Sequence, residues 1–252
     1  MTPDIKNTGA KPATVVKEAA VTGPSILVAP KKEAVKEFHW AIIRGDLEVD
    51  FGNGLIDQNN IKDFYLKHFP DDIHYWTFIE SIFDNPKEFL IKSTWDRNDI
   101  KSFLDESSID EARELLHDNQ LIDFKFPIQV KHKDRNTHTS NFHIYVMKND
   151  QLSSTRAMFI RKWLPISGEC NLKTHKHPVF LWTFVEEKVL GTFLGDCEEA
   201  DHKHFSGPLA EKKRYIKAKD TLADIRAASK RLLDILFELN DNEFKNLLGE
   251  MF

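Results

Sequence analysis

Phe124-Lys125-Phe126-Pro127-Ile128-Gln129-Val130 decides the fold, because apolar and polar side chains alternate along it. A period of two is typical of a strand with one buried face. Asn141-Phe142-His143-Ile144-Tyr145-Val146 alternates in the same way, and residues 157–166 and 179–185 are two further strand-like runs. The sequence therefore predicts a compact four-stranded mixed sheet.

Helical patterns flank this sheet on both sides. From Thr221, with Asp224 as a capping-box-like partner, apolar residues recur at helical spacing toward Leu239. Before the sheet we expect a helix near residues 35–43, a hairpin of residues 47–51 and 55–56, and a helix from Asn59 or Asn60 to Phe69. Residues 71–122 are expected to be mostly helical, with a helix starting near residues 107–111. The predicted fold class is α+β.

The composition divides the chain into three parts. Residues 1–35 contain four prolines and no aromatic residue, which predicts a flexible arm. Residues 36–123 form a hairpin and helical region. Residues 124–252 form an α/β domain with C-terminal helices.

Charge and cysteine content narrow the class of protein. The net charge of −5 provides no global field that would attract nucleic acid. Two cysteines make a disulfide scaffold improbable and suit a reducing cytoplasm, where we expect the protein to be located. No apolar run approaches the roughly 20 residues that a membrane helix needs, so no membrane association is expected.

One polar segment is a candidate functional loop. Phe193-Leu194-Gly195-Asp196-Cys197-Glu198-Glu199-Ala200-Asp201-His202 follows a strand-like run and precedes a patterned helix. Gly195 and Asp196 predict a sharp turn there, with the Asp196 carboxylate capping backbone amides. Residues 195–206 offer few apolar groups for core packing, so we expect a partner to act on this loop.

Three phrases carry a resemblance to a known family. They are residues 159–167 (Phe-Ile-Arg-Lys-Trp-Leu-Pro-Ile-Ser), residues 194–198 (Leu-Gly-Asp-Cys-Glu) and residues 219–226 (Lys-Asp-Thr-Leu-Ala-Asp-Ile-Arg). Together with the hairpin segment 38–56, they resemble the transducer portion of bacterial GHKL ATP-binding proteins, the class of histidine-kinase-like, gyrase-B-like and chaperone-like ATPases. The likeness covers residues 38–252 and is nearest to large bacterial members, some of which are linked to phage defence.

The resemblance implies a function that depends on a partner. A transducer domain has a fold like that of a small ribosomal protein, and it supplies one cation to the γ-phosphate of ATP held by another domain. Lys203 and Arg161 would be the nucleotide phosphate contacts, acting in trans, because a fixed cation stabilises charge that develops on the phosphate. The chain would then be the regulatory half of a split or truncated ATPase. It would bind no cofactor alone and would meet ATP and Mg²⁺ through a protein partner with the nucleotide-binding domain.

An autonomous ATP site is not expected. Asp50-Phe51-Gly52-Asn53-Gly54 spells the Asp-x-Gly-x-Gly pattern that contacts adenine in this family. However, no Asn-bearing helix precedes it and no glycine lies between residues 55 and 167 to form a lid. A hairpin turn is the better interpretation of this motif.

Two alternative functions remain open from the sequence. Cys170, His175 and His177 repeat the spacing of Cys197, His202 and His204, and these are ligand types that zinc prefers. A strand between the two groups separates them, so we expect no tight zinc binding. The basic stretch Lys212-Lys213-Arg214-Tyr215-Ile216-Lys217 could contact a nucleic-acid backbone, although a solvated helix face explains it as well.

Overall fold

The computed structural model describes residues 28–51, 54–162, 164–169, 177–200 and 202–237. The chain divides into two compact units, residues 1–76 and 77–252. The boundary falls inside helix α4 (Ile73–Ile82), before the change of periodicity near residue 124. Each unit is described by itself below.

Unit 1 contains the predicted elements, but its first helix begins at Val28, so residues 28–35 of the predicted flexible arm are helical. It contains α2 (Val28–Ile43), the antiparallel pair β1 (Val49–Asp50) and β2 (Leu55–Ile56), α3 (Ile61–His68) and the 3-10 turn η1 (Pro70–Asp72). Pro70 starts η1 directly after α3 because proline cannot donate the hydrogen bond that would continue the helix. In the core, His39 on α2 shares a 3.0 Å hydrogen bond with the Tyr75 hydroxyl. Asp50 is exposed on the predicted hairpin, whose residues 52 and 53 lie outside the described residues.

Unit 2 is built on a six-stranded mixed sheet, in the order β3-β4-β5-β8-β6-β7. The strands are β3 (Lys87–Leu90), β4 (Ile122–Lys131), β5 (Thr137–Lys148), β6 (Arg156–Arg161), β7 (Leu164–Pro165) and β8 (Val179–Val185). The four predicted strands correspond to β4, β5, β6 with β7, and β8. The predicted strand 157–166 is divided because Lys162 adopts a left-handed φ of 60°, after which β7 pairs back on β6.

Strand β3 was not expected, because residues 71–122 were predicted to be mostly helical. It pairs in parallel with β4, and helix α5 (Glu106–His117) and the 3-10 turn η2 (Ile100–Ser102) lie in the connection between them. A four-residue strand is too short to show a period, so its pairing partner specifies it. Unit 2 therefore has an α+β fold whose sheet has six strands, where the sequence predicted four.

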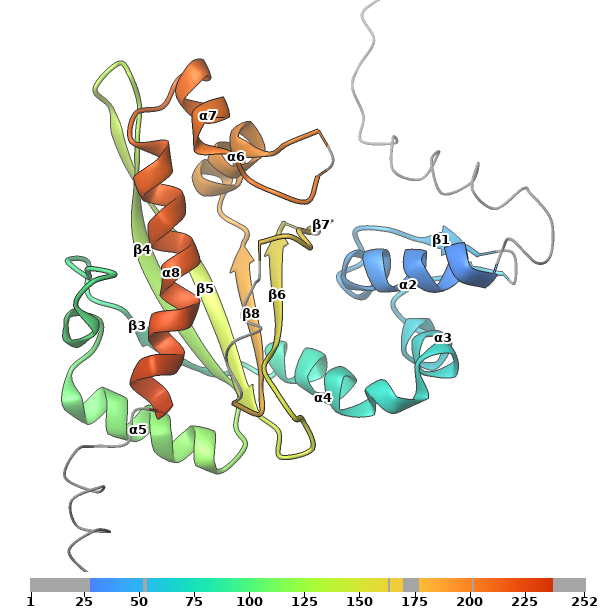
Figure 1. Cartoon of the computed structure of the whole chain (residues 1–252). Helices are drawn as coiled ribbons and strands as arrows, with labels where there is room; N and C mark the ends of the chain where they lie inside the picture. Colours follow the sequence, from blue (N-terminus) through green and yellow to red (C-terminus); the bar gives the residue numbers. More distant parts are fainter. Residues whose placement is uncertain (1–27, 52–53, 163, 170–176, 201, 238–252) are drawn as a thin grey trace, which may run out of the picture. The chain divides into compact units, whose positions relative to one another are not determined.

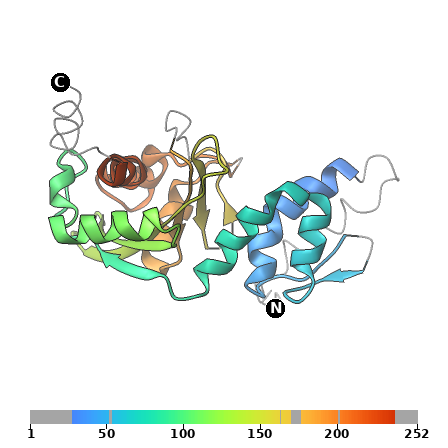
Figure 2. The same cartoon turned by 90° about the horizontal axis from the view of Figure 1, so that it is seen from below.

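Helices cover one face of this sheet. Inward residues of β4, β5 and β8 share one apolar core with α5, α6 (Lys188–Cys197), α7 (Gly207–Lys213) and α8 (Ala218–Phe237). Figure 1 shows α8 running along the strands, and Figure 2 shows it nearly end-on. A 2.8 Å hydrogen bond between Thr183 and Ser229 joins β8 to α8 within the core.

The opposite face of the sheet is covered only in part. Phe78 of α4 stacks on Phe180 and meets Trp182 edge-on, both at 5.2 Å between ring centroids. Strand β8 is thus buried on both faces, which explains its continuous apolar run. Toward β3 this second face carries polar side chains, which form the candidate site described below.

Two predicted boundaries in unit 2 are wrong. Gly195 and Asp196 were expected in a turn, but both lie in the last turn of α6, which continues to Cys197. The terminal helix begins at Ala218 and not at Thr221. Thr221 therefore caps nothing; its hydroxyl donates to the Gln129 carbonyl at 3.4 Å, and Asp224 pairs with Arg97.

No helix in the described part of the chain has the length and apolar character needed to cross a membrane.

Candidate metal and acid–base site

The site is formed by two rows of side chains on the second face of the sheet. Strand register places Glu88 beside Asp123, and Asp123 beside Tyr145. The next row runs through Lys125 and His143, which are paired across β4 and β5. Because alternate residues of a strand share a face, these five side chains point to the same side. His143 lies diagonal to Asp123, within reach of a long side chain.

Short contacts join the members of the two rows. His143 Nδ1 lies 2.9 Å from both carboxylate oxygens of Asp123. Lys125 Nζ lies 3.6 Å from Glu88 Oε2. One ligand atom each from Glu88, Asp123 and His143 lies within 4.8 Å of the other two. Among the described residues, this is the one group of three such side chains with ligand atoms so close together.

The three possible ligand side chains differ in how far they are exposed to solvent. The Asp123 side chain is 9% exposed, that of His143 22% and that of Glu88 48%. The carboxylate of Asp123 is therefore held in place by the sheet, whereas Glu88 and His143 open the cluster to solvent.

Electrostatics around Tyr145 show that the site is negative. Burial raises the pKa of Tyr145 well above its usual range, and the charges of Asp123, Glu186 and Glu88 raise it further. The phenol thus keeps its proton at neutral pH. Three carboxylates that disfavour a phenolate favour a cation for the same reason.

The ligand types and distances suit a small divalent cation. A metal binds carboxylate oxygen and imidazole nitrogen at about 2.0–2.2 Å, so two ligand atoms on one ion lie at most about 4.4 Å apart. The cluster must contract by only a few tenths of an ångström to meet this limit. Two carboxylates and one imidazole would leave further coordination positions for water or substrate.

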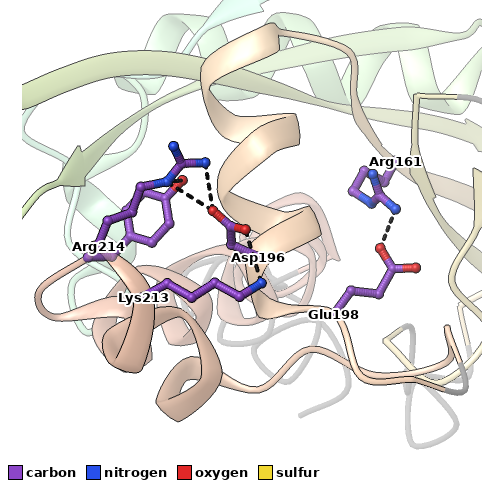
Figure 3. A network of polar contacts seen from close by, with 6 residues as sticks. Arg161, Asp196, Glu198, Lys213 and Arg214 are labelled. Atoms are coloured by element: carbon purple, nitrogen blue, oxygen red, sulfur yellow. Dashed lines mark hydrogen bonds and ion pairs between the residues drawn. The ribbon is translucent and has the colours of Figure 1, made fainter. Parts of the chain in front are cut away.

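The residues that the sequence analysis predicted to be functional mainly make ion pairs and hydrogen bonds within the fold. Asp196 binds Lys213 Nζ at 3.0 Å and Arg214 Nη2 at 2.7 Å, and so ties α6 to the end of α7 (Figure 3). Burial alone would raise the pKa of Asp196, but the hydrogen bonds from Lys213 and Arg214 outweigh it and lower that pKa. Within the described part of the chain, the Asp196 carboxylate accepts hydrogen bonds from the side chains of Lys213 and Arg214 and not from backbone amides of a turn, so it makes ion pairs where we expected it to cap a loop.

Arg161 forms an ion pair with Glu198, as Figure 3 shows. We expected Arg161 to be a phosphate contact; here its guanidinium faces the carboxylate that follows α6. Glu198 also binds His202, and its backbone bridges to Phe205. Lys203 is exposed between these anchors, and its carbonyl accepts a 2.9 Å hydrogen bond from the Gly168 amide.

A buried carboxylate anchors the same loop from its other side. Glu169 accepts hydrogen bonds from the Phe205 amide at 2.6 Å and from two nitrogens of Arg226 at 2.7 Å. The Glu169 side chain is only 2% exposed. The described residues of this loop, 198–200 and 202–206, are therefore held by the chain's own ion pairs and by the buried ring of Phe205.

The residues of the alternative zinc hypothesis do not form a cluster in the described part of the chain. Cys170 and His175 lie outside the described residues, and the ring of His177 stacks on Phe237 at 4.0 Å. Cys197 is fully buried, and that burial raises its pKa to about 12. Since zinc binds the thiolate, a thiol that resists ionisation is a poor ligand. His202 binds Glu198, and His204 packs beside Gly168.

Sequence reasoning missed Glu88, Asp123 and His143. Asp123 and His143 stand at polar positions of alternating strands, which is where solvent-facing residues are expected. The available signal was that a histidine and an aspartate occupy such positions on two consecutive strands. Only the register of β4 and β5 brings the two side chains together.

Comparisons with protein-family models, with curated proteins and with solved structures found no match for this chain. The resemblance to GHKL transducer domains therefore stays a prediction.

Proposed function

We propose that unit 2 binds a divalent cation at Glu88, Asp123 and His143, and that this site serves hydrolysis of a phosphate ester. The observation that carries the proposal is the convergence of two carboxylates and one imidazole within 4.8 Å on three adjacent strands. A fully structural Asp–His pair would not need the third carboxylate beside it.

The donor set favours a particular group of cations. Imidazole suits Zn²⁺, Fe²⁺ and Mn²⁺, whereas Mg²⁺ prefers oxygen ligands alone. We therefore expect Mn²⁺ and Zn²⁺ to bind more tightly than Mg²⁺. Because a ligating imidazole must be unprotonated, binding should weaken as the pH falls.

Two neighbours supply the remaining chemistry of the site. The Lys125 ammonium, close to Glu88, is placed to bind an anionic group of a substrate. Tyr145 stays protonated and can donate a hydrogen bond to the same group. A bound cation lowers the pKa of its water, and this water is the nucleophile that hydrolysis requires.

The first experiment measures binding alone, by electron paramagnetic resonance of Mn²⁺ titrated with the protein. We expect one bound ion per chain and a loss of affinity of at least about 10-fold in Glu88→Gln and His143→Gln, since each removes one of three ligands. Glu88 is exposed, so Glu88→Gln should fold normally even if substitutions at the buried Asp123 do not.

The matched control is His117→Gln with Asp118→Asn, which removes the exposed histidine–carboxylate pair of α5. This variant should bind Mn²⁺ as the wild type does. Absence of stoichiometric binding at millimolar Mn²⁺, or equal binding by Glu88→Gln, would refute the site. Hydrolysis of bis(p-nitrophenyl) phosphate that needs Mn²⁺ and is lost in Lys125→Met then tests the reaction.

A second candidate function has its own supporting observation. Lys203 is exposed at a loop that ion pairs hold on both sides, and such rigid presentation is what a trans-acting cation requires. We infer on this basis the role of a regulatory half of a GHKL-type ATPase in phage defence, acting with a partner that holds ATP and Mg²⁺. Loss of ATPase activity in a reconstituted complex with Lys203→Ala supports it; wild-type activity in that complex counts against it.

A further inference from the structure

Two basic segments that lie far apart in the sequence meet at one end of the sheet. The turn between β4 and β5 contributes residues 131–138, and the end of α7 with the start of α8 contributes residues 211–220. Figure 1 shows this hairpin beside α7. The amide of Lys133 donates to the Arg214 carbonyl at 2.9 Å, and the amide of Ile216 donates to the Lys131 carbonyl at 2.9 Å.

The combined surface, called the basic patch below, is strongly positive. Its eight cations are Lys131, Lys133, Arg135, Lys212, Lys213, Arg214, Lys217 and Lys219. Four carboxylates accompany them, Asp134, Asp196, Glu211 and Asp220, which leaves a local surplus of four positive charges on a chain of net charge −5. All eight cations are exposed except Lys131, which is half-buried.

The fold brings these like charges close together, and their electrostatic repulsion is unfavourable. Lys133 Nζ donates to the carbonyls of Lys212 and Lys213 at 3.5 and 3.3 Å, so the two segments bring their cations close to one another. Arg135 and Lys217 adopt left-handed φ values of 70° and 56°, which are uncommon for residues with long side chains. Repulsion between these cations destabilises the folded chain unless an anion binds there.

A polar cavity of about 310 Å³ adjoins the patch. Lys131 and Lys217 of the patch line it, together with Gln129, Thr139 and the half-buried ring of Trp95, whose indole N–H donates to the Pro127 carbonyl at 2.7 Å. The carboxylates of Asp220 and Asp224 also line it, and Asp224 is paired with Arg97. This volume lies at the lower end of the range for small-molecule sites, about 300–1,000 Å³, and is enough for a nucleobase. Amide, hydroxyl and indole groups are those that contact bases in single-stranded nucleic acids.

We propose that the basic patch binds single-stranded nucleic acid, with phosphates on the lysines and arginines and a base in the Trp95 cavity. A basic patch also attracts an anionic membrane surface, but stable anchoring there takes a second, apolar signal, and Ile216 is the one large apolar residue of the patch that is markedly exposed. The proposal is independent of the cation site. Lys131 lies eight residues along β4 from Asp123, about 27 Å away at roughly 3.4 Å per residue.

The test is fluorescence anisotropy of labelled dT20 and rU20 titrated with the full chain. If about five cations contact phosphates, the logarithm of the association constant falls with a slope of about −3.5 against the logarithm of salt concentration. Affinity should then drop about 100-fold between 50 and 200 mM salt. Binding to a duplex of the same length should be weaker, because its bases are not available to the cavity.

Variants separate the two parts of the surface. Lys133→Glu with Lys217→Glu should reduce affinity at least about 10-fold and flatten the salt slope, since phosphate contacts are lost. Trp95→Phe should reduce affinity several-fold and leave the slope unchanged. The control Lys148→Glu with Lys230→Glu makes the same change of net charge within unit 2, at the end of β5 far from the turn and on α8, and should bind as the wild type does.

Several outcomes would overturn the proposal. They are no binding of either oligonucleotide at 50 mM salt, equal affinity of the Lys133→Glu/Lys217→Glu variant, or sedimentation with phosphatidylserine vesicles without oligonucleotide binding. The last result would assign the patch to a membrane surface. Failure of Mn²⁺ binding at Glu88 would leave this proposal untouched, because the two assays use different residues.

Discussion

Replacement of Glu169 by glutamine should release the loop of residues 198–206 and destabilise unit 2. The Glu169 carboxylate is 2% exposed and accepts three hydrogen bonds, from the Phe205 amide and from Nε and Nη2 of Arg226. Each hydrogen bond to a charged group contributes about 1.5–3 kcal/mol. Glutamine keeps one acceptor oxygen, and Arg226 is 43% exposed and can be rehydrated, so we expect a net loss of about 2 kcal/mol.

The assay is thermal unfolding followed by circular dichroism, with urea unfolding at pH 7 as a second measure. For a unit of this size, about 2 kcal/mol lowers Tm by about 4–8 °C. Tryptic cleavage after Lys203 should also become faster, because the loop opens locally. The matched control is Glu111→Gln, which removes the exposed ion pair with Lys87 and should cost under about 1 kcal/mol. If Glu169→Gln and Glu111→Gln unfold at the same temperature, the buried anchor has no such role.

Two further predictions concern Asp196 and Cys197. The pKa of Asp196 is lowered in the folded protein, so its ion pairs stabilise the fold above the unfolded-state pKa of about 3.9, and this stability is lost as the pH falls through the folded-state pKa. Asp196→Asn should therefore lower the free energy of unfolding, measured with urea, by about 1 kcal/mol at pH 7. The loss should be smaller at the lowest pH at which both proteins fold. An equal loss at both pH values contradicts the ion-pair role. The Cys197 thiol is buried and its pKa is raised to about 12, so it should react with Ellman's reagent only after unfolding. The measurement uses Cys170→Ser protein, so that Cys197 is the one thiol. Rapid reaction of the folded chain would show that α6 does not bury it.

The sequence pattern of a single segment was sufficient to predict a helix or strand where the segment's own side chains specify that element. The alternation in residues 124–130 and 141–146 predicted β4 and β5 because one face of each strand is buried and the other is polar. Pro70 marked the end of α3 in unit 1 for the same kind of local reason. Asn60 precedes this helix, but its side chain accepts from the Asp57 amide and donates to the Leu55 carbonyl, so it does not cap α3 as expected. The hairpin β1–β2 followed from the glycines between its strands.

Local pattern failed where packing overrides propensity. Gly191 and Gly195 weaken the helical signal of α6, yet both lie inside it. A Cβ at Gly195 would lie 3.6 Å from Arg161 Nη1, and one at Gly191 would lie 3.4 Å from Lys162 Cε. Both distances are ordinary van der Waals contacts with flexible side chains, so the available space does not require glycine at either position. Burial of Leu190, Phe193 and Leu194 against the sheet specifies the helix in spite of the two glycines.

The sequence by itself determined the α+β class, the strands β4 and β5, and the amphipathic α8, because these depend on periods that a single segment displays. It determined β8 through a continuous apolar run. The tertiary structure alone decided which polar residues are neighbours. Glu88, Asp123 and His143 come from three strands, and the parallel pairing of β3 with β4 places the first beside the second. The basic patch likewise joins residues 131–138 to residues 211–220 through backbone hydrogen bonds. Both sites depend on strand register and helix docking, which follow from burial of the whole core and leave no mark on any short stretch of sequence.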